Sequence, residues 1–553
     1  MKSAGSGEEV RSTRVEQNRM AELQFISAQD YADPFNTVSL DAVITDPDGG
    51  QCRVPGFWAG GDRWKVRYAS GKVGKHTYRT ECSDPANVGL HGLSGEIDIV
   101  PYTGDNPLYK HGPVQVAADR RHLQHADGTP FFWLGDTWWM ALCKRLHWPE
   151  DFETLAADRL QKGFTVIQIV AGLYPDMPAF DERGANEAGF PWEADYDRIR
   201  PEYFDAADRR LEYLCDSGLT PCIVGVWGYF LPWMGVERAK QHWRYLVARY
   251  GALPVVWCVA GEANLPWYLA PGFPYDDREQ VKGWTEVARY LREIDPYHRP
   301  MSIHPTGLGR LSARGAIDDS ALIDFDMLQT GHGGREVLAP TVSTLRWSYD
   351  QKPTMPVLNS EVSYEALMGT IPADIQRLMF WASMLSGAAG HTYGANGIWQ
   401  VNRADQPHGA SPHGGNYGTI PWDEAMRLPG STQLALGKRL LERYPWQQFE
   451  PHPEWATFAA EPPEGDNGGF QTPYAAGISG ELRIIYAPLQ QAVTVQKLEP
   501  GVTYQATRFD PTTGATAALG AVEPDAQGDW TCPAPGGAEP DWVLILEAQE
   551  TAR

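Results

Sequence analysis

The chain has 553 residues, a formal net charge of -23 and an isoelectric point near 5.0. Its length exceeds what one hydrophobic core supports, since single cores stop growing at about 250–300 residues, so we expect two or three domains. The acidic balance disfavours nucleic acids and anionic membranes as partners, and the sequence contains no apolar run long enough to span a bilayer.

Residues 1–18 are polar and contain no apolar run of the kind that a secretion signal needs. We expect this segment to be disordered and the protein to be cytoplasmic. The seven cysteines favour the same location, because they are widely spaced and form no Cys-x-x-Cys pair. Such spacing indicates reduced thiols rather than a disulfide framework or a zinc site.

Residues 19–106 form short runs in which apolar and polar residues alternate, separated by turn residues. Three such runs are VSLDAVIT (38–45), KHTYRTEC (75–82) and GEIDIV (95–100). Period-two alternation at this spacing is typical of a small antiparallel β-sandwich.

Residues 107–450 repeat the order strand, loop, helix. Helical stretches at 151–163, 203–218 and 278–294 separate continuous apolar runs, which indicate strands buried on both faces. The eight runs lie at 131–136, 164–170, 220–227, 254–262, 300–304, 324–329, 356–361 and 388–394. Eight such units predict a (β/α)₈ or TIM barrel. A doubly wound open sheet is the alternative, but no Gly-x-Gly-x-x-Gly turn or Walker loop accompanies it.

Residues 451–553 return to short strand-like runs, such as LRIIYA (482–487) and WVLILEA (542–548). A second antiparallel β-sandwich is therefore expected at the C-terminal end. The predicted fold class is α/β, a barrel with a β-sandwich on each side.

Two glutamates stand directly after buried strands of the predicted barrel. Glu262 follows VVWCVAG and Glu361 follows MPVLNS. They are 99 residues apart, which places them on strands four and seven at about 33 residues per βα unit. A carboxylate at the end of a buried strand needs either a partner or a function. The structural alternative is that each one pairs with a neighbouring arginine.

Active sites of such barrels form at the C-terminal ends of the strands. Retaining glycosidases need two carboxyl groups facing each other there, one as nucleophile and one as general acid/base. Strand seven supplies the nucleophile and strand four the acid/base in many barrel glycosidases, so we assign Glu361 and Glu262 these roles. The remaining polar and aromatic residues at strand ends are predicted substrate ligands: Asp136, Trp138, Trp139, Trp227, Asn264, His304, Gln329, His332, His391, Tyr393 and Trp399.

Several of these ligands have alternative roles. Asp136 could instead cap the following helix. The three histidines could hold a metal, but no His-x-His pair follows strand one and no lysine is placed to bridge two metals. We therefore expect neither a metal nor a cofactor, and we expect the histidines to bind substrate. Tyr393 could hydrogen-bond the nucleophile, and Trp399 could form the floor of the sugar site or pack in its loop.

The segment from 402 to 422 is rich in Gly, Pro and His. It is long enough to act as a lid over the pocket. The alternative is a mobile surface loop.

The whole pattern resembles the apiosidase-like glycoside hydrolases. The matching motifs are YADPFN (31–36), VPGFWAGGDRWKVRYA (54–69), GKHTYRT (74–80), FFWLGDTWW (131–139) and GFTVIQIV (163–170), together with the two strands that end in Glu262 and Glu361. The resemblance implies a (β/α)₈ catalytic domain after an N-terminal β-sandwich. It also implies a C-terminal domain of the type labelled collagen-binding, from which we infer a fold and no function. In this family the acid/base is often an Asp after two glycines, whereas this chain has Ala260-Gly261-Glu262.

The predicted function is a retaining glycoside hydrolase that removes a terminal sugar, with a pentose or furanose favoured, from a small glycoside or an oligosaccharide. Because the side chain of Glu262 is one methylene group longer than that of an Asp, the resemblance implies the glycosidase class without implying apiose as the sugar. Two alternatives remain, a non-catalytic carbohydrate-binding barrel and a metal-dependent barrel hydrolase. A homo-oligomer is compatible with the exposed sandwich faces.

Overall fold

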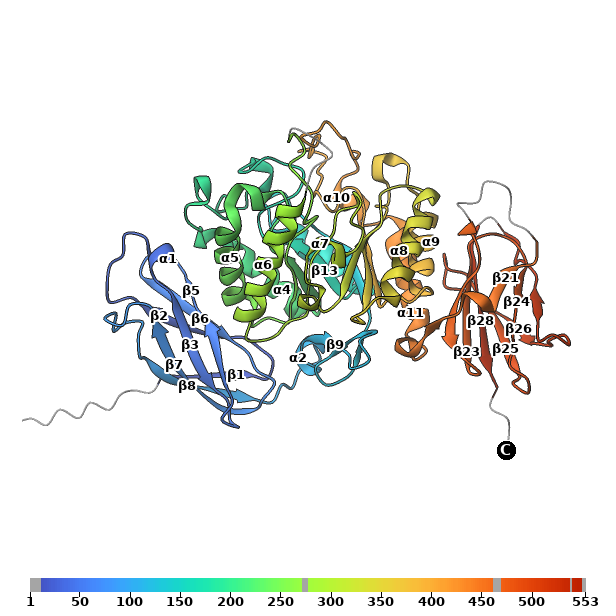
Figure 1. Ribbon diagram of the computed structural model, residues 1–553, viewed down its shortest axis with the longest axis horizontal. Helices are drawn as coiled ribbons and strands as arrows, with labels where there is room; N and C mark the ends of the chain where they lie inside the picture. Colours follow the sequence, from blue (N-terminus) through green and yellow to red (C-terminus); the bar gives the residue numbers. More distant parts are fainter. Residues whose placement is uncertain (1–10, 271–276, 461–468, 538–539, 550–553) are drawn as a thin grey trace, which may run out of the picture.

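The structure, a computed structural model, describes residues 11–270, 277–460, 469–537 and 540–549. Three parts follow one another along the long axis of the molecule, an N-terminal β-sandwich, a central barrel and a C-terminal β-sandwich (Figure 1). The first ten residues of the segment that we expected to be disordered lie outside the described residues. The next six form strand β1 (Arg11–Glu16), which pairs in parallel with β8 (Ser94–Val100).

The N-terminal sandwich packs a five-stranded sheet against a three-stranded one. The larger sheet has the order β1-β8-β7-β3-β4 and the smaller one β2-β6-β5. The predicted alternation is present, since buried and exposed residues alternate along β2. The strands are β2 (Ala21–Ile26), β3 (Leu40–Thr45), β4 (Gln51–Pro55), β5 (Phe57–Trp58), β6 (Arg63–Tyr68) and β7 (Gly74–Cys82). Two short helices, α1 (Pro34–Thr37) and α2 (Pro107–Lys110), and a small sheet of β9 (Val114–Val116), β10 (Leu123–His125) and β11 (Pro130–Phe131) lead toward the barrel.

The central domain is the predicted (β/α)₈ barrel. Its eight strands are parallel, and every residue in them is buried. The ladder runs β16-β15-β14-β13-β12-β19-β18-β17, and the amide of Asp324 donates to the carbonyl of Met301 at 2.8 Å across the remaining gap. The strands are β12 (Trp133–Thr137), β13 (Val166–Val170), β14 (Thr220–Val224), β15 (Val256–Cys258), β16 (Met301–Ser302), β17 (Asp326–Gln329), β18 (Val357–Glu361) and β19 (Gly390–Tyr393).

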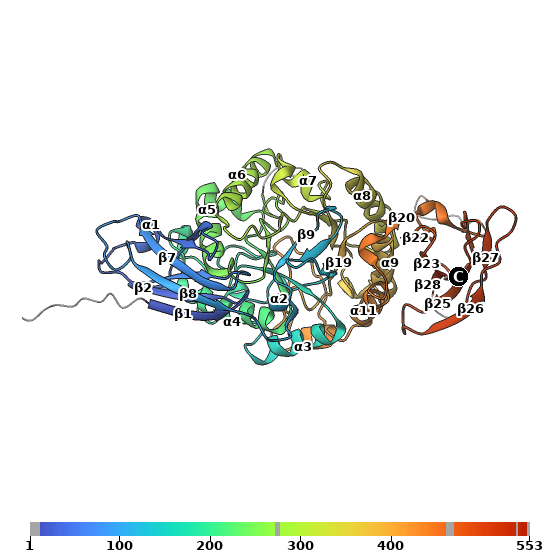
Figure 2. The same cartoon turned by 90° about the horizontal axis from the view of Figure 1, so that it is seen from below.

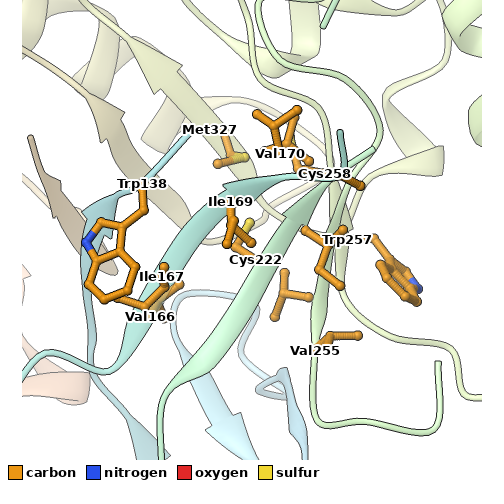
Figure 3. Close-up of a cluster of buried hydrophobic side chains, with 14 of the residues drawn as sticks. Trp138, Val166, Ile167, Ile169, Val170, Cys222, Val255, Trp257, Cys258 and Met327 are labelled. Carbon is orange, nitrogen blue, oxygen red and sulfur yellow. The ribbon is translucent and has the colours of Figure 1, made fainter. Parts of the chain in front are cut away.

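Helices surround these strands in a ring, as Figure 2 shows from below. The long ones are α3 (Glu150–Lys162), α4 (Pro201–Ser217), α5 (Phe230–Tyr250), α6 (Arg278–Ile294), α8 (Leu338–Asp350), α9 (Ala373–Met384) and α11 (Pro429–Leu441), with short α7 (Ala313–Ala316) and α10 (Trp422–Ala425). The barrel interior contains apolar side chains from several strands, including Val166, Cys222 and Met327 (Figure 3). This packing gives the strand ends a rigid base. Among the described residues, no helix has the length and apolar character that crossing a membrane requires.

The C-terminal domain is a second β-sandwich, with sheets β20-β22-β23-β28-β25-β26 and β21-β24-β27. Its strands are β20 (Glu450–Pro451), β21 (Ala456–Phe458), β22 (Tyr474–Ile478), β23 (Leu482–Ala487), β24 (Val493–Val495), β25 (Tyr504–Phe509), β26 (Thr516–Ala521), β27 (Trp530–Cys532) and β28 (Trp542–Ala548).

Buried ion pairs join both sandwiches to the barrel. Arg67 of the N-terminal sandwich bonds Asp208 of α4 at 2.6 Å, and Arg377 of α9 bonds Asp541 at 2.7 Å. These side chains are almost fully buried, and removing one partner of such a pair leaves an uncompensated charge. The sandwiches are therefore fixed to the barrel through specific contacts.

Candidate active site

A cavity of about 600 Å³ opens at the C-terminal ends of the barrel strands. Glu262 and Glu361 both line it, as do Gln329 and His332. The predicted aromatic ligands Trp139, Trp227 and Trp399 line it as well. The strand ends therefore bring seven of the thirteen predicted site residues to one cavity.

The two glutamates share one hydrogen-bond donor. The side-chain nitrogen of Gln329 donates to Oε1 of Glu262 at 2.9 Å and to Oε1 of Glu361 at 3.0 Å. The two oxygens are thus at most 5.9 Å apart, the sum of these distances. Only the amide NH₂ group fits between two carboxyl groups, because the amide oxygen would repel an ionised carboxylate.

The register of strand β17 explains how Gln329 reaches this position. The pairing of β17 with β18 shifts between Leu328 and Gln329, so that Gln329 lies opposite Glu361 instead of Ser360. A bulge of this kind redirects a side chain at the end of a strand. The local irregularity therefore places the amide between the two carboxyl groups.

Glu361 is held in its ionised form by the groups around it. Burial opposes its charge, but hydrogen bonds from His332 and Tyr364 and the nearby His304 prevail and lower its pKa below the ordinary value. Nε2 of His332 lies 2.8 Å from Oε1, and Nε2 of His304 lies 3.4 Å from Oε2. The same contact raises the pKa of His332, although burial opposes it. His332 and Glu361 thus form a charged pair at the cavity wall.

The surroundings of Glu262 favour its protonated form. Burial and the negative charge of Glu361 raise its pKa to about 8, so it is protonated at neutral pH. Its backbone has φ of 41°, a left-handed conformation that is uncommon outside glycine. The backbone beside it is crowded, since a Cβ on Gly228 would lie 2.2 Å from the carbonyl oxygen of Glu262. A Cβ on Gly261 would meet the ring of Trp227 at the same distance.

His304 and His391 are not among the residues that line the cavity, although His304 contacts Glu361. Nδ1 of His304 is 2.9 Å from the carbonyl of Pro305, and its ring packs edge-on against Trp139. His391 is fully buried next to Phe380, and burial lowers its pKa to about 3. His391 is therefore a neutral core residue. In the described part of the chain, no three His, Cys, Asp or Glu side chains are grouped to hold a metal ion.

Asp136 also lies beneath the cavity lining, where it takes part in a structural network. Its Oδ2 accepts hydrogen bonds from Arg159 at 2.5 Å and from Trp138 at 2.7 Å, and Oδ1 accepts from the amide of Thr137 at 2.9 Å. Asp136 and Arg159 are both fully buried. Since helix α3 begins after Pro149, Asp136 does not cap it either. Asp136 and Trp138 thus support the barrel wall, in contrast to the predicted contact with substrate.

Tyr393 does not reach the nucleophile. Its hydroxyl donates to Glu365 at 2.5 Å, and the amide of Gly430 donates to the same carboxyl group. The phenol that bonds Glu361 is instead Tyr364, whose oxygen accepts a hydrogen bond from Trp139 at 3.1 Å. Tyr393 thus bonds Glu365 and not the nucleophile, and the tyrosine that lowers the pKa of Glu361 belongs to the loop after β18. Asn264 also lies outside the lining, with its amide directed to the carbonyl of Ala316.

Residues of the segment 402–422 line part of the cavity. Tyr417 and His413 line the cavity, and Ser411 donates a hydrogen bond to Asp176 at 2.6 Å. Asp176 is a cavity carboxyl group that the sequence interpretation missed, and burial raises its pKa. It also bonds Tyr268 from the loop after Glu262. Its place six residues after strand β13, at the same edge as Glu262, is the signal that could have found it.

Comparisons with solved structures show the fold. A putative glycoside hydrolase from Bacteroides vulgatus ATCC 8482 is 18% identical with a TM-score of 0.68, and covers 97% of this chain and 100% of its own. A glycoside hydrolase family 5 protein from the same organism is 21% identical with a TM-score of 0.66, and the match covers 80% of this chain and 95% of that protein. Another glycoside hydrolase is 21% identical with a TM-score of 0.64, and the match covers 80% of this chain and 98% of that protein. No curated protein matches the sequence.

The sequence itself defines the family. The apiosidase-like catalytic domain matches residues 117–448, which is more than half of the chain. A domain of unknown function, DUF5060, matches residues 14–83 within the N-terminal sandwich. The chain therefore belongs to the apiosidase-like family and is a glycoside hydrolase.

Proposed function

We propose that the enzyme is a retaining glycosidase in which Glu361 is the nucleophile and Glu262 the general acid/base. The observation that carries this proposal is the shared amide of Gln329, which keeps the two carboxyl oxygens within 5.9 Å of each other. Retaining enzymes have carboxyl groups about 5–5.5 Å apart, whereas inverting enzymes need about 6.5–9.5 Å to admit a water molecule. The spacing supports retention.

The opposed pKa shifts support the assignment of roles. A nucleophile must be ionised, and the pKa of Glu361 is lowered by His332 and its neighbours. A general acid must carry a proton, and the pKa of Glu262 is raised to about 8. Pairs of carboxyl groups whose surroundings separate their pKa values commonly divide acid and nucleophile roles in this way.

The reaction then proceeds in two balanced steps. In the first, an oxygen of Glu361 bonds to the anomeric carbon while the bond to the leaving oxygen breaks, and that oxygen takes the proton of Glu262. In the second, ionised Glu262 takes a proton from water, the water oxygen bonds to the anomeric carbon, and Glu361 is released. Oε2 of Glu361 is the attacking oxygen, because Oε1 accepts the hydrogen bonds from Gln329 and His332.

For the sugar, we propose a terminal pentose or furanose residue, on the basis of the family. The loop at 402–422 supports action at a chain end, because its contact with Asp176 narrows the cavity on that side. His332, Gln329 and Asp176 would bind hydroxyl groups, and Trp139 and Trp399 offer apolar faces to the C–H side of the ring. The seven free cysteines support a reducing, cytoplasmic compartment.

The test is hydrolysis of a panel of aryl β-glycosides, namely the apioside, arabinofuranoside, galactofuranoside, glucoside and xyloside. Wild type should release one aglycone, and Glu361→Gln should lose at least about 10⁴-fold in kcat/KM. Glu365→Gln is the matched control, since Glu365 is a buried carboxyl group on the same segment but bonds Tyr393 outside the cavity. It should keep its activity.

The configuration of the first-formed sugar, followed by NMR, tests the mechanism separately. Retention is expected. Inversion, or undiminished activity of Glu361→Gln, would contradict the assignment. Sugar binding without turnover by wild type would favour the non-catalytic alternative.

A further inference from the structure

Large apolar side chains are unusually exposed around the mouth of the cavity. Leu308 and Met368 both line the cavity and are 60% exposed, and Leu269 in the loop after Glu262 is 61% exposed. Single exposed apolar residues are common on protein surfaces, but a group of them around one opening marks a binding surface.

Aromatic rings extend this surface outward. Trp267 lines the cavity, and its ring lies 5.0 Å from that of Trp233, which is itself 36% exposed. Tyr229 packs against both rings. An aromatic face thus runs from the solvent to the cavity.

Four of the apolar lining residues follow the strand of the proposed acid/base or the next strand, whereas Met368 belongs to the loop after β18, the strand of Glu361. Leu265, Pro266 and Trp267 lie three to five residues after Glu262 in the chain, and Leu308 comes from the next loop, after β16. None of these four side chains can bind a hydroxyl group except through the indole N–H of Trp267. The nearby hydrogen-bonding side chains already have partners within the protein, since Tyr268 bonds Asp176 and His332 bonds Glu361.

We propose that this side of the cavity is a subsite for an apolar leaving group, an aryl or long-chain alkyl alcohol, in place of a second sugar. The inference rests on the proposed function, because the leaving group departs on the side of the residue that protonates it, Glu262. The substrate would then be a glycoside of an apolar alcohol, held by Trp267 and Leu308 on one wall and Met368 on another.

Hydrogen bonding is the reason for preferring an apolar alcohol over a sugar. A sugar in this subsite would bring several hydroxyl groups out of water, and each needs a polar partner to offset its desolvation. Trp267 alone could stack on a sugar ring, but exposed Leu308 and Met368 offer the hydroxyl groups nothing. An apolar leaving group would instead remove these side chains from water.

The first experiment uses the sugar identified by the panel, attached to methanol, hexanol or octanol. These alcohols are similarly poor leaving groups, so differences in rate report contacts with the chain. Each fully buried methylene group contributes up to about fourfold. We expect kcat/KM to rise at least about tenfold from the methyl to the octyl glycoside. A flat series, or a disaccharide that is cleaved faster than the octyl glycoside, would overturn the subsite while leaving the glycosidase assignment in place.

Variants then locate the effect. Leu308→Ser and Trp267→Ala should each reduce the octyl-to-methyl ratio of kcat/KM by about threefold or more. Trp347→Ala is the matched control, because Trp347 is 49% exposed on helix α8 but does not line the cavity. Its ratio should equal that of wild type. Equal ratios in all three variants would contradict the location.

A binding measurement makes the inference independent of turnover. Titration calorimetry of wild type with 2-naphthol, an apolar alcohol without a sugar, should show saturable binding that Leu308→Ser weakens and Trp347→Ala does not. If no glycoside is cleaved but naphthol binds in this way, the proposed function fails and the apolar subsite stands. If glycosides are cleaved and naphthol does not bind, the subsite fails alone.

Discussion

Asp136 and Glu361 are carboxyl groups at equivalent places, near the ends of strands β12 and β18, yet their surroundings differ. Asp136 accepts hydrogen bonds from Arg159, Trp138 and a backbone amide, so its charge and its lone pairs are matched in a fully buried network. Glu361 shares one of its donors with Glu262 and faces a cavity of about 600 Å³. The number and kind of donors distinguish a carboxyl group that supports the fold from one that is available for chemistry.

We expect the largest effect on activity from a change in Glu262, which shares the amide group of Gln329 with Glu361. Glu262→Gln keeps the hydrogen bond with Gln329 sterically possible but removes the acid, so kcat/KM for an alkyl glycoside should fall about 10³-fold. The loss should be smaller for a dinitrophenyl glycoside, which needs no protonation, and azide should restore turnover by replacing the activated water. An equal loss for both substrates without rescue would contradict the acid/base role.

Removing the carboxyl group of Asp136 should lower the stability of the fold and leave the activity nearly unchanged. Asp136→Ala removes the fully buried partner of Arg159, which keeps only the less buried Asp158, and it leaves the indole N–H of Trp138 without its acceptor. The fold should therefore lose about 3 kcal/mol of stability. Thermal unfolding should begin at clearly lower temperature, while the folded fraction keeps kcat within about threefold. Asp48→Ala is the control, since Asp48 pairs with Lys72 at the surface, where ion pairs contribute little to stability, and Lys72 keeps Asp46 as a partner. A folded but inactive Asp136→Ala variant would contradict the structural role of Asp136.

Two tyrosines provide a smaller, paired test. Tyr364→Phe removes a hydrogen bond to Glu361, so kcat/KM should fall about tenfold and the acidic limb of its pH profile should move to higher pH. Tyr393→Phe removes the hydroxyl that bonds Glu365 and should leave both quantities within about twofold of wild type. Steady-state rates at several pH values distinguish the two. Similar losses in both variants would mean that Tyr393 also acts on the nucleophile.

The smallest expected effect is a pH dependence. Because burial and Glu361 raise the pKa of Glu262 to about 8, the acid loses its proton as the pH rises through that value, and kcat/KM should fall on the alkaline side. On the acidic side the rate should fall only below the ordinary range of a glutamate, since the pKa of Glu361 is lowered. The alkaline limb should disappear in Glu262→Gln. Its persistence there would assign the limb to another group.

The fold was predictable because its main signal is local. Strands buried on both faces are continuous apolar runs, and all eight barrel strands lie within or at the runs predicted for them. Strand β1 was missed because its partner β8 lies more than 80 residues away in the sequence, and the mostly polar residues Arg11–Glu16 carry no local pattern that predicts this pairing.

The site was predictable only in part, because some of its residues are placed by contacts between segments that are distant in the sequence. Glu262 and Glu361 stand at the ends of strands, where periodicity identifies them. The role of Asp136 depends on Arg159, which reaches it from helix α3 only in the folded chain. Asp176 and Tyr364 lie on loops, whose conformations follow from tertiary contacts instead of from a repeating pattern.

The left-handed backbone of Glu262 has a consequence for the evolution of this enzyme. A residue other than glycine with φ of 41° costs about 1–3 kcal/mol, and the raised pKa of its carboxyl group adds a further cost above the pH at which an unfolded glutamate ionises. A glycine at this position would relieve both costs at once. Mutational drift toward a more stable protein would therefore erase the acid/base early, so its survival in a lineage is a sign of continuing selection for catalysis.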